Sequence, residues 1–398
     1  MSETLAELAR TRRVVTCVGA GGVGKTTVAA AVALEAARRG RRAVVITIDP
    51  ARRLADALGV AELDNEPRAL PAERLAALGV DGGGSLSAMM LDMKRTLDDL
   101  VHRFAPDAES RERILANSIY QHVSDTLAGT AEYSAMEKVY ELAERADFDL
   151  IVVDTPPSQH AIDFLDAPQR LIEFLDSRIV QLLVHPAFAA GRFGFRIFQR
   201  GAHRMLQLIE RVSGVGFLED LSDFLLAFEG MSEGFRDRAR RVRALLLGSD
   251  CAFLLVSGPG HRSVEDAIRF LERLQEGGVP VEGVVMNRMR AWPGGGEPPE
   301  RIPADGDRDA AVRILAGALA AADGEGFPAE HAARAALDAV DRYASSVRRD
   351  LEVTKPLVEQ ALAADFIAQR VPELPGDVHD LEGLSLVAAA LFPEDERA

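Results

Sequence analysis

The chain has 398 residues, of which 47% are hydrophobic and 27% are charged, a composition typical of a globular protein with a large core and not of a disordered one. Its formal net charge of −16 argues against general nucleic-acid binding, because proteins that bind nucleic acids usually present a basic face. The two cysteines, Cys17 and Cys251, belong to no Cys/His cluster, so we expect two buried thiols in a reducing cytosol and no zinc or iron–sulfur site within one chain.

The N-terminal residues 1–13 contain no apolar segment of the kind found in signal peptides. No other stretch approaches about 20 uninterrupted apolar residues, the length that spans a bilayer. We therefore expect neither a signal peptide nor a transmembrane segment. The predicted location is cytoplasmic, with a peripheral position at the membrane as the alternative.

Short runs rich in Val and Ile alternate along the chain with longer helical segments. The runs predict buried strands at residues 13–18, 43–48, 150–153, 252–256, 281–286 and 366–371, and residues 85–90 are also strand-like. This alternation predicts an α/β fold with a doubly wound, mostly parallel sheet. Right-handed crossovers would then place the loops after the strands on one edge of the sheet, where ligands bind.

Two segments depart from this alternation. Residues 91–146 and 161–247 are mostly helical in pattern, and we interpret them as helical insertions into a single domain that spans residues 1–398. Residues 292–306 are rich in Pro and Gly and predict a flexible loop.

Residues 19–26 read GAGGVGKT and match the P-loop pattern G-x-x-x-x-G-K-[ST], between a predicted strand and a predicted helix. Such glycines let backbone N–H groups surround phosphates, and the helix N-terminus adds a favourable dipole. Lys25 would place its charge on the β- and γ-phosphates and would act as a catalytic residue, while the Thr26 hydroxyl would bind Mg²⁺. A glycine-rich turn that binds nothing is the alternative. The predicted ATP-binding residues of this loop are Gly21, Gly22, Val23, Gly24, Lys25, Thr26 and Thr27.

Two aspartates follow predicted strands. Asp154 ends an apolar run, as in a Walker B strand, so we expect it to hold Mg²⁺ through a water together with Thr26; an ordinary cap of the next turn is the alternative. Asp49 ends the strand at residues 43–48 and is a candidate catalytic residue that orients or deprotonates the attacking water. A helix N-cap role for Asp49 explains the pattern equally well.

The segments GAGGVGKTT, ITIDPARRLADALG and VVDTPPSQHAIDFL resemble the arsenite-pump ATPase (ArsA) family, which includes ATPases that target tail-anchored membrane proteins. The resemblance runs from about residue 13 to about residue 390. Within the family, the sequence is similar to a branch that is common in actinobacteria and whose members are usually called ArsA-like or anion-transporting ATPases. It implies that residues 49–51 form switch I and residues 154–160 form switch II. It also implies that Asn287 reads adenine and that Pro372 belongs to a loop near the base.

The sequence departs from this family at Ala20, where a signature lysine usually reaches the ATP of a facing subunit. Either another basic group or a paralogous subunit must supply that charge, so we expect a homodimer or a heteromer with a Lys-bearing paralogue. The cysteine cluster that binds metalloid is missing. A Met-rich client groove is not evident either, because residues 161–247 contain only Met205 and Met231.

These patterns predict an ATP-hydrolysing switch that couples Mg·ATP hydrolysis to a conformational change and to an unknown protein or membrane-associated client. The alternative is a nucleotide-gated scaffold subunit with weak hydrolysis that needs the Lys-bearing paralogue. A partitioning ATPase would need the signature lysine and a basic DNA-binding face or membrane helix. One stripe, formed by Arg192, Arg196, Arg200 and Arg204, predicts either a basic face for a membrane or acidic partner or simply a solvated helix face.

Overall fold

The computed structural model describes residues 4–49, 53–118, 120–121, 130–156, 173, 233–234, 236–303, 306–323 and 328–393. The predicted arginine stripe at residues 192–204 and most of the predicted insertion at residues 161–247 lie outside these ranges.

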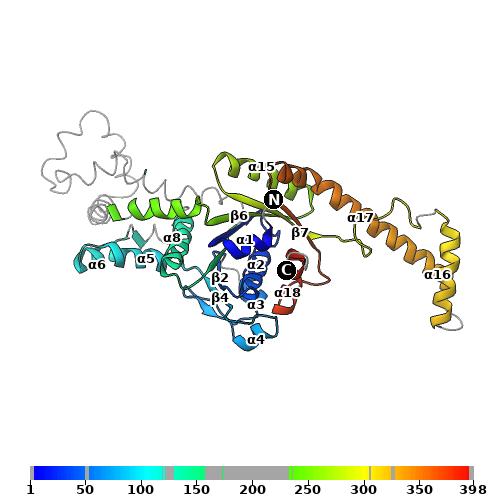
Figure 1. The fold of residues 1–398 in the computed structure, drawn as a ribbon, viewed down its shortest axis with the longest axis horizontal. Helices are drawn as coiled ribbons and strands as arrows, with labels where there is room; N and C mark the ends of the chain where they lie inside the picture. Colours follow the sequence, from blue (N-terminus) through cyan, green and yellow to red (C-terminus); the bar gives the residue numbers. More distant parts are fainter. Residues whose placement is uncertain are drawn as a thin grey trace.

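An eight-stranded sheet with the order β3-β4-β2-β5-β1-β6-β7-β8 forms the centre of the molecule (Figure 1). The strands are β1 (Val14–Gly19), β2 (Arg42–Thr47), β3 (Arg68–Ala69), β4 (Ser85–Met90), β5 (Leu150–Asp154), β6 (Cys251–Ser257), β7 (Val281–Met289) and β8 (Ile367–Pro372). All neighbours are parallel except the short edge strand β3, which the sequence did not predict. The predicted α/β class with a mostly parallel sheet is therefore confirmed.

Helices cover both faces of the sheet, which is why the central strands are mostly apolar. In β1, Val15 and Cys17 pack into one core and Val14 and Val18 into the other. The first core includes α1 (Leu5–Thr11), α2 (Lys25–Arg38), α3 (Arg53–Leu58), α4 (Ala72–Ala76) and α18 (Leu381–Leu391). The second includes α8 (Thr130–Arg145), residues 242–246, α15 (His261–Glu276) and the C-terminal part of α17 (Ala329–Ala363).

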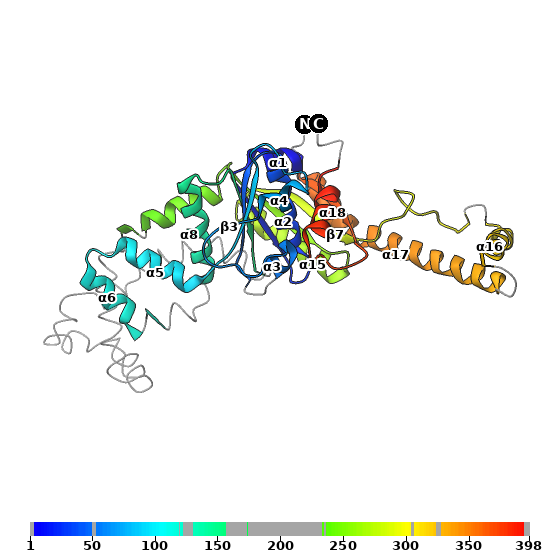
Figure 2. The ribbon, with the colours of Figure 1, turned by 90° about the horizontal axis from the view of Figure 1, so that it is seen from below.

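The described part of residues 91–146 includes the helices α5 (Met93–Phe104), α6 (Ala108–Ala116) and α8. The Asp92 side chain caps α5 by accepting from the N–H of Arg95 at 2.9 Å. These helices lie at one end of the molecule, beside the helical residues 236–246 (Figures 1 and 2).

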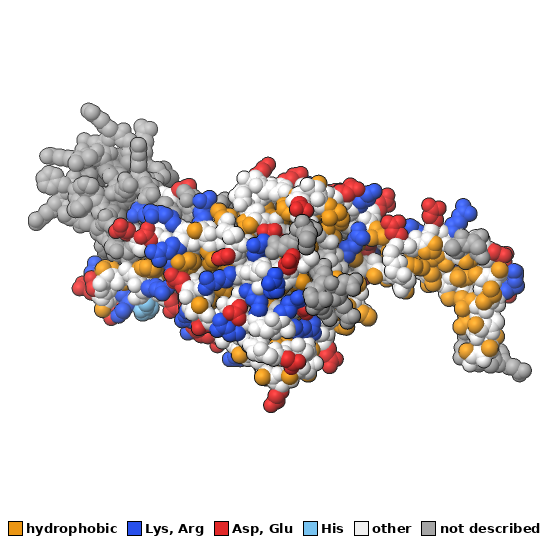
Figure 3. Space-filling model, viewed as in Figure 1, with side chains coloured by type: hydrophobic (Ala, Val, Ile, Leu, Met, Phe, Trp, Pro, Cys, Tyr) orange, Lys and Arg blue, Asp and Glu red, His pale blue; other side chains and the backbone are white. Residues whose placement is uncertain are grey.

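An arm projects from the opposite end of the molecule (Figures 1 and 2). It consists of α16 (Arg308–Asp323) and the N-terminal part of α17, and Arg308 joins the two helices by ion pairs to Asp338 and Asp341. Hydrophobic side chains gather on the arm in Figure 3, and Ile314 is 76% exposed. The sequence indicated a helix at residues 329–364 but not that it leaves the body of the protein.

Residues 292–303 contain no helix or strand, and they are attached to α17. Arg348 Nη1 donates to the Pro299 carbonyl at 2.5 Å, and the hydroxyl of Tyr343 donates to the Ala291 carbonyl at 3.0 Å. The predicted flexibility of this loop stays a prediction. Within the described ranges, none of the helices combines the length and apolarity needed to cross a bilayer.

Candidate functional site

The carboxyl ends of β1, β2, β5, β7 and β8 meet at one edge of the sheet, around a cavity of about 660 Å³. This is the edge where ligands bind in doubly wound sheets. The structure brings nearly all of the predicted site residues together there. Those that line the cavity are Gly21, Gly22, Gly24, Lys25, Thr26, Thr27, Asp49, Asp154, Asn287 and Pro372.

The glycines of the loop at residues 19–26 allow close packing against neighbouring strands. A Cβ on Gly19 would lie 2.1 Å from the Val256 carbonyl oxygen, and one on Gly24 would lie 2.2 Å from Asn287 Nδ2. Gly24 also has φ 91°, in the left-handed region that favours glycine, and it precedes the first turn of α2. Gly24 has no side chain to cap this helix, so the first N–H groups of α2 remain for an anionic ligand.

Lys25 is the first residue of α2, and its side chain folds back over the loop. Its Nζ donates to the Ala20 carbonyl at 2.9 Å, and the residue is only 7% exposed. Burial lowers the pKa of Lys25, while the nearby carboxylates of Asp154 and Asp49 raise it. The loop thus holds a cation where the P-loop pattern predicts the β- and γ-phosphates.

Asp154 is the last residue of β5, lies near Lys25 and is 1% exposed. Its Oδ2 accepts hydrogen bonds from Thr26 Oγ1 at 2.7 Å and from Thr47 Oγ1 at 2.9 Å. Burial raises the pKa of Asp154, and these two hydrogen bonds and Lys25 lower it.

The second carboxylate oxygen of Asp154, Oδ1, is buried and has no hydrogen-bond partner among the described residues. A buried polar atom without a partner indicates a missing water or ion. Carboxylate and hydroxyl oxygens are the ligands that Mg²⁺ prefers. The residues present therefore fit a magnesium site formed by Asp154 and Thr26.

Asp49 lies at the rim of the cavity after β2. Its N–H donates to Thr47 Oγ1 at 3.3 Å, and its carboxylate pairs with Arg53 at 3.5 Å. This position is open to a ligand, as a residue that acts on water requires. Residues 50–51 of the predicted switch I and residues 157–160 of the predicted switch II lie outside the described part of the chain.

Asn287 is 5% exposed, and its Nδ2 donates to the carbonyl of Val23 at 2.8 Å. It therefore holds the P-loop, in addition to lying in the cavity where the base was predicted. Pro372 ends β8, and the segment at residues 373–379 continues the wall of the cavity.

Three functional candidates were missed by sequence reasoning: Thr47, Arg53 and Arg288. Thr47 is a polar residue that directly follows four apolar residues of its strand, which was a usable signal. Arg288 follows Asn287 directly and lines the cavity, but only the structure shows that it contacts the loop.

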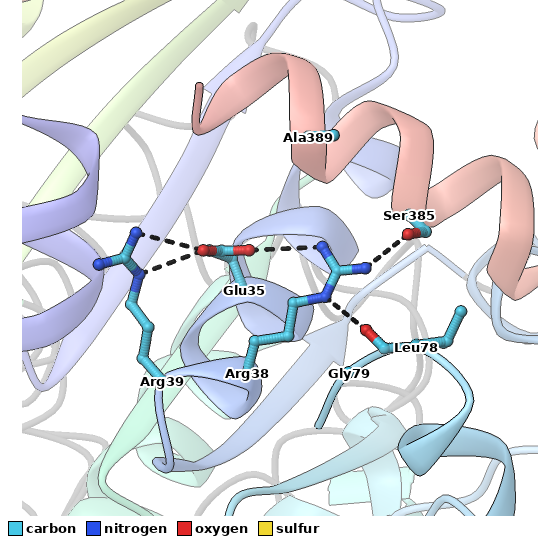
Figure 4. Close-up of a pocket in the computed structure, with 7 residues that line it drawn as sticks. All are labelled: Glu35, Arg38, Arg39, Leu78, Gly79, Ser385 and Ala389. Atoms are coloured by element: carbon cyan, nitrogen blue, oxygen red, sulfur yellow. Dashed lines mark hydrogen bonds and ion pairs between the residues drawn. The ribbon is translucent and has the colours of Figure 1, made fainter. Parts of the chain in front are cut away.

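A second hollow, of about 420 Å³, lies at the opposite end of α2 (Figure 4). There the buried Glu35 accepts from Arg38 at 3.4 Å and from Arg39 at 3.2 Å, and Arg38 Nε also donates to the Leu78 carbonyl at 2.8 Å. Arg38 reaches the Ser385 hydroxyl on α18 as well. The bond from Arg38 to Ser385 connects α2 to α18, so we interpret the charged residues of this hollow as structural.

A family model described as "Anion-transporting ATPase" matches residues 12–292 of this chain. The chain is also 24% identical over 281 residues to "ATPase GET3" of Malassezia globosa, a match that covers 71% of this chain and 74% of the relative. It is 30% identical over 153 residues to "ATPase get3" of Aspergillus terreus, covering 38% and 41% of the two chains. Residues 19–26 and the buried carboxylate of Asp154 lie beside one cavity, and the matches show that this chain belongs to the anion-transporting ATPase family and is an ATP hydrolase.

Proposed function

We propose that the chain binds Mg·ATP on residues 19–26 and uses hydrolysis as a conformational switch that acts on a client. The observation that carries this proposal is the buried, unpaired Oδ1 of Asp154, next to a threonine hydroxyl and a buried lysine. A buried carboxylate with an unused oxygen is costly unless an ion completes its surroundings.

Each residue of the site has a distinct task in this proposal. Thr26 and Asp154 hold Mg²⁺, which would neutralise charge on the phosphates when bound. Lys25 exchanges its hydrogen bond with the Ala20 carbonyl for one with a phosphate oxygen. Asp49 orients or deprotonates the attacking water, and its partly exposed position at the rim of the cavity supports this role.

A chain of hydrogen bonds supports the switch. Asp154 accepts from the hydroxyl of Thr47, and the same Thr47 oxygen accepts from the N–H of Asp49. A change in the charge around Asp154 therefore acts on the segment that begins at Asp49. A switch of this kind requires that the residues around Asp49 differ between the nucleotide-bound and the nucleotide-free state.

The base would lie between Asn287 and the loop that begins at Pro372. The amide of Asn287 carries both a donor and an acceptor, which suits the adenine edge. Because Asn287 also holds Val23, Asn287→Ala should weaken binding of all nucleotides besides lowering discrimination against GTP.

The Lys25→Ala variant tests the proposed site. We expect it to lose most of its affinity for Mg·ATP in calorimetry, because a charge-assisted contact to phosphate is removed, at a cost of about 1.5–3 kcal/mol. Arg313→Ala, an exposed change on the arm, serves as the control and should bind normally. Unchanged affinity in Lys25→Ala would show that residues 19–26 are not the nucleotide site.

The client is proposed to be a protein or a membrane-associated factor, and the assembly a homodimer or a heteromer with a paralogue. Asp49→Asn should keep ATP bound and hold the client-bound state. Affinity purification with Asp49→Asn in the presence of ATP, compared with the same purification using Lys25→Ala, would identify proteins whose binding depends on nucleotide. A protein captured equally by both variants is not a client of the switch.

A further inference from the structure

The end of β7 passes the P-loop on a bulge. Between its pairings with β8 at Met286 and Met289, the two residues Asn287 and Arg288 lie opposite a single residue of β8. Bulges are rare between parallel strands and are over-represented beside active sites, where they turn side chains to new directions. Arg288 has φ 59°, a left-handed conformation that is unfavourable for an arginine and that tends to persist only where the surroundings require it.

The bulge turns two consecutive side chains toward the same loop. Successive side chains of a regular strand point to opposite faces of the sheet. Here Asn287 Nδ2 donates to the carbonyl of Val23 at 2.8 Å, and Arg288 Nη1 donates to the carbonyl of Gly22 at 3.5 Å. Asn287 is buried, whereas Arg288 is exposed and its contact is long. A guanidinium has five N–H donors, so this contact leaves most of them for a ligand.

The charges around the cavity give Arg288 a particular place. Lys25 lies near the carboxylate of Asp154, and Arg53 pairs with Asp49 at 3.5 Å. Arg288 forms no ion pair with a carboxylate of the described residues. The carboxylates that line the cavity are those of Asp49, Asp56, Asp154, Glu373 and Asp377. A triphosphate adds several negative charges, so a further cation beside the loop is needed to balance them.

We propose that Arg288 is a phosphate-binding residue of this site and that its guanidinium donates to a phosphate oxygen of the ATP bound on the same chain's P-loop. This inference rests on the proposed ATP site at residues 19–26. The planar fork of arginine matches phosphate oxygens, and the bond from Asn287 to Val23 fixes the bulge to the loop that it serves. The arginine therefore supplies charge to its own site without help from a second chain.

Arg288→Asn and Arg288→Lys test the proposal as a pair. Asn tolerates the left-handed backbone and removes the charge, whereas Lys keeps the charge. We expect Arg288→Asn to lower kcat/KM for ATP and the calorimetric affinity for Mg·ATP at least about tenfold, with the melting temperature of the nucleotide-free protein unchanged. Arg288→Lys should retain a larger part of both. Arg269→Gln, an exposed arginine on α15 outside the cavity, should match the unmodified protein.

A mixing experiment decides which chain's ATP the arginine serves. Lys25→Ala and Arg288→Asn chains, each impaired alone, should not restore activity when mixed, because each site needs both residues from one chain. Restored activity would show that Arg288 acts across a subunit interface and would overturn the proposal.

Three further outcomes are decisive. Normal kinetics and affinity in Arg288→Asn would overturn the proposal. An equal loss in both Arg288 variants together with a lower melting temperature would also overturn it, because that result would indicate a structural role. An unmodified protein that does not bind Mg·ATP would instead refute the ATP site itself.

Discussion

At the scale of single residues, the two aspartates of the proposed site have different surroundings. Asp154 is buried and accepts two hydroxyl hydrogen bonds, whereas Asp49 is partly exposed and pairs with Arg53. A buried carboxylate with an unused oxygen suits a metal ion, and one at the rim of a cavity suits a water. The two residues should therefore fail in different ways when their charge is removed.

Asp49→Asn should keep the affinity for ATP and lower turnover by about a hundredfold or more, the usual loss when a general base is removed. Asp154→Asn should instead raise the Mg²⁺ concentration needed for half-maximal activity. Calorimetry with ATP, combined with ATPase rates over a range of Mg²⁺ concentrations, separates the two. A normal rate in Asp49→Asn would show that its catalytic assignment is wrong.

The two cysteines make a second prediction at this scale. Both are buried free thiols; burial raises the pKa of Cys251 to about 12 and raises that of Cys17 even further. The thiolate is the reactive form, so the native protein should react only slowly with a thiol reagent at neutral pH. Both thiols should react rapidly after denaturation. A fast-reacting thiol in the native protein would contradict their burial.

At the scale of elements, a buried ion cluster attaches α8 to residues 236–246. Arg238 Nε donates to Glu137 Oε1 at 2.6 Å, Nη1 pairs with Glu144, and the guanidinium lies 4.2 Å from the centre of the Tyr140 ring. Burial raises the pKa of Glu137, and its bonds to Arg238 lower it. Glu137 is therefore a buried carboxylate that Arg238 stabilises most strongly, with a smaller contribution from Arg103.

Arg238→Met should lower the free energy of unfolding by about 3 kcal/mol, because it leaves Glu137 buried without its cation. Arg240→Met is the matched control: Arg240 is exposed and pairs with Asp237 within one helical turn, so its loss should change stability by less than about 0.5 kcal/mol. Urea denaturation of both variants measures the difference. Equal stability would show that the cluster does not hold these helices together, and Glu137→Met combined with Arg238→Met should recover part of the loss.

At the scale of the whole molecule, the open question is where the missing charge at Ala20 comes from. Its carbonyl accepts from Lys25, but its side chain has no charge to offer a facing subunit. If Arg288 serves its own site, the isolated chain should hydrolyse ATP unaided. If a paralogue supplies the charge, turnover should rise when that paralogue is added.

We expect the first result. Ala20→Lys should then change the turnover of the isolated chain by less than about threefold, which corresponds to less than about 0.7 kcal/mol of activation free energy. Steady-state ATPase rates, measured with and without a Lys-bearing paralogue, provide the comparison. A large acceleration by either the substitution or the paralogue would favour the heteromer and count against a self-sufficient site. A stable homodimer would not decide between them, because a dimer can form without complete sites.

Much of the fold follows from local sequence pattern. The predicted strands differ from the observed ones by at most three residues at their ends, because strands buried on both faces are nearly continuous apolar runs. The glycine spacing of residues 19–26 and the aspartates after β2 and β5 are equally local signals. Parallel strands with right-handed crossovers then bring these strand ends to one edge of the sheet.

Only the tertiary structure decided how that edge is completed. Thr47 links Asp154 to Asp49 through a hydrogen bond to Asp154, which lies more than 100 positions away in the sequence. The bulge turns Arg288 to the loop through a change of strand register. The two-residue strand β3 and the projecting arm were also absent from the pattern, because a short edge strand has no periodicity and a helix's direction depends on what it packs against. The sequence by itself determined the apolar strands other than β3 and the functional residues that follow them, because these are local signals; spatial proximity, hydrogen-bond partners and side-chain direction depend on the complete fold.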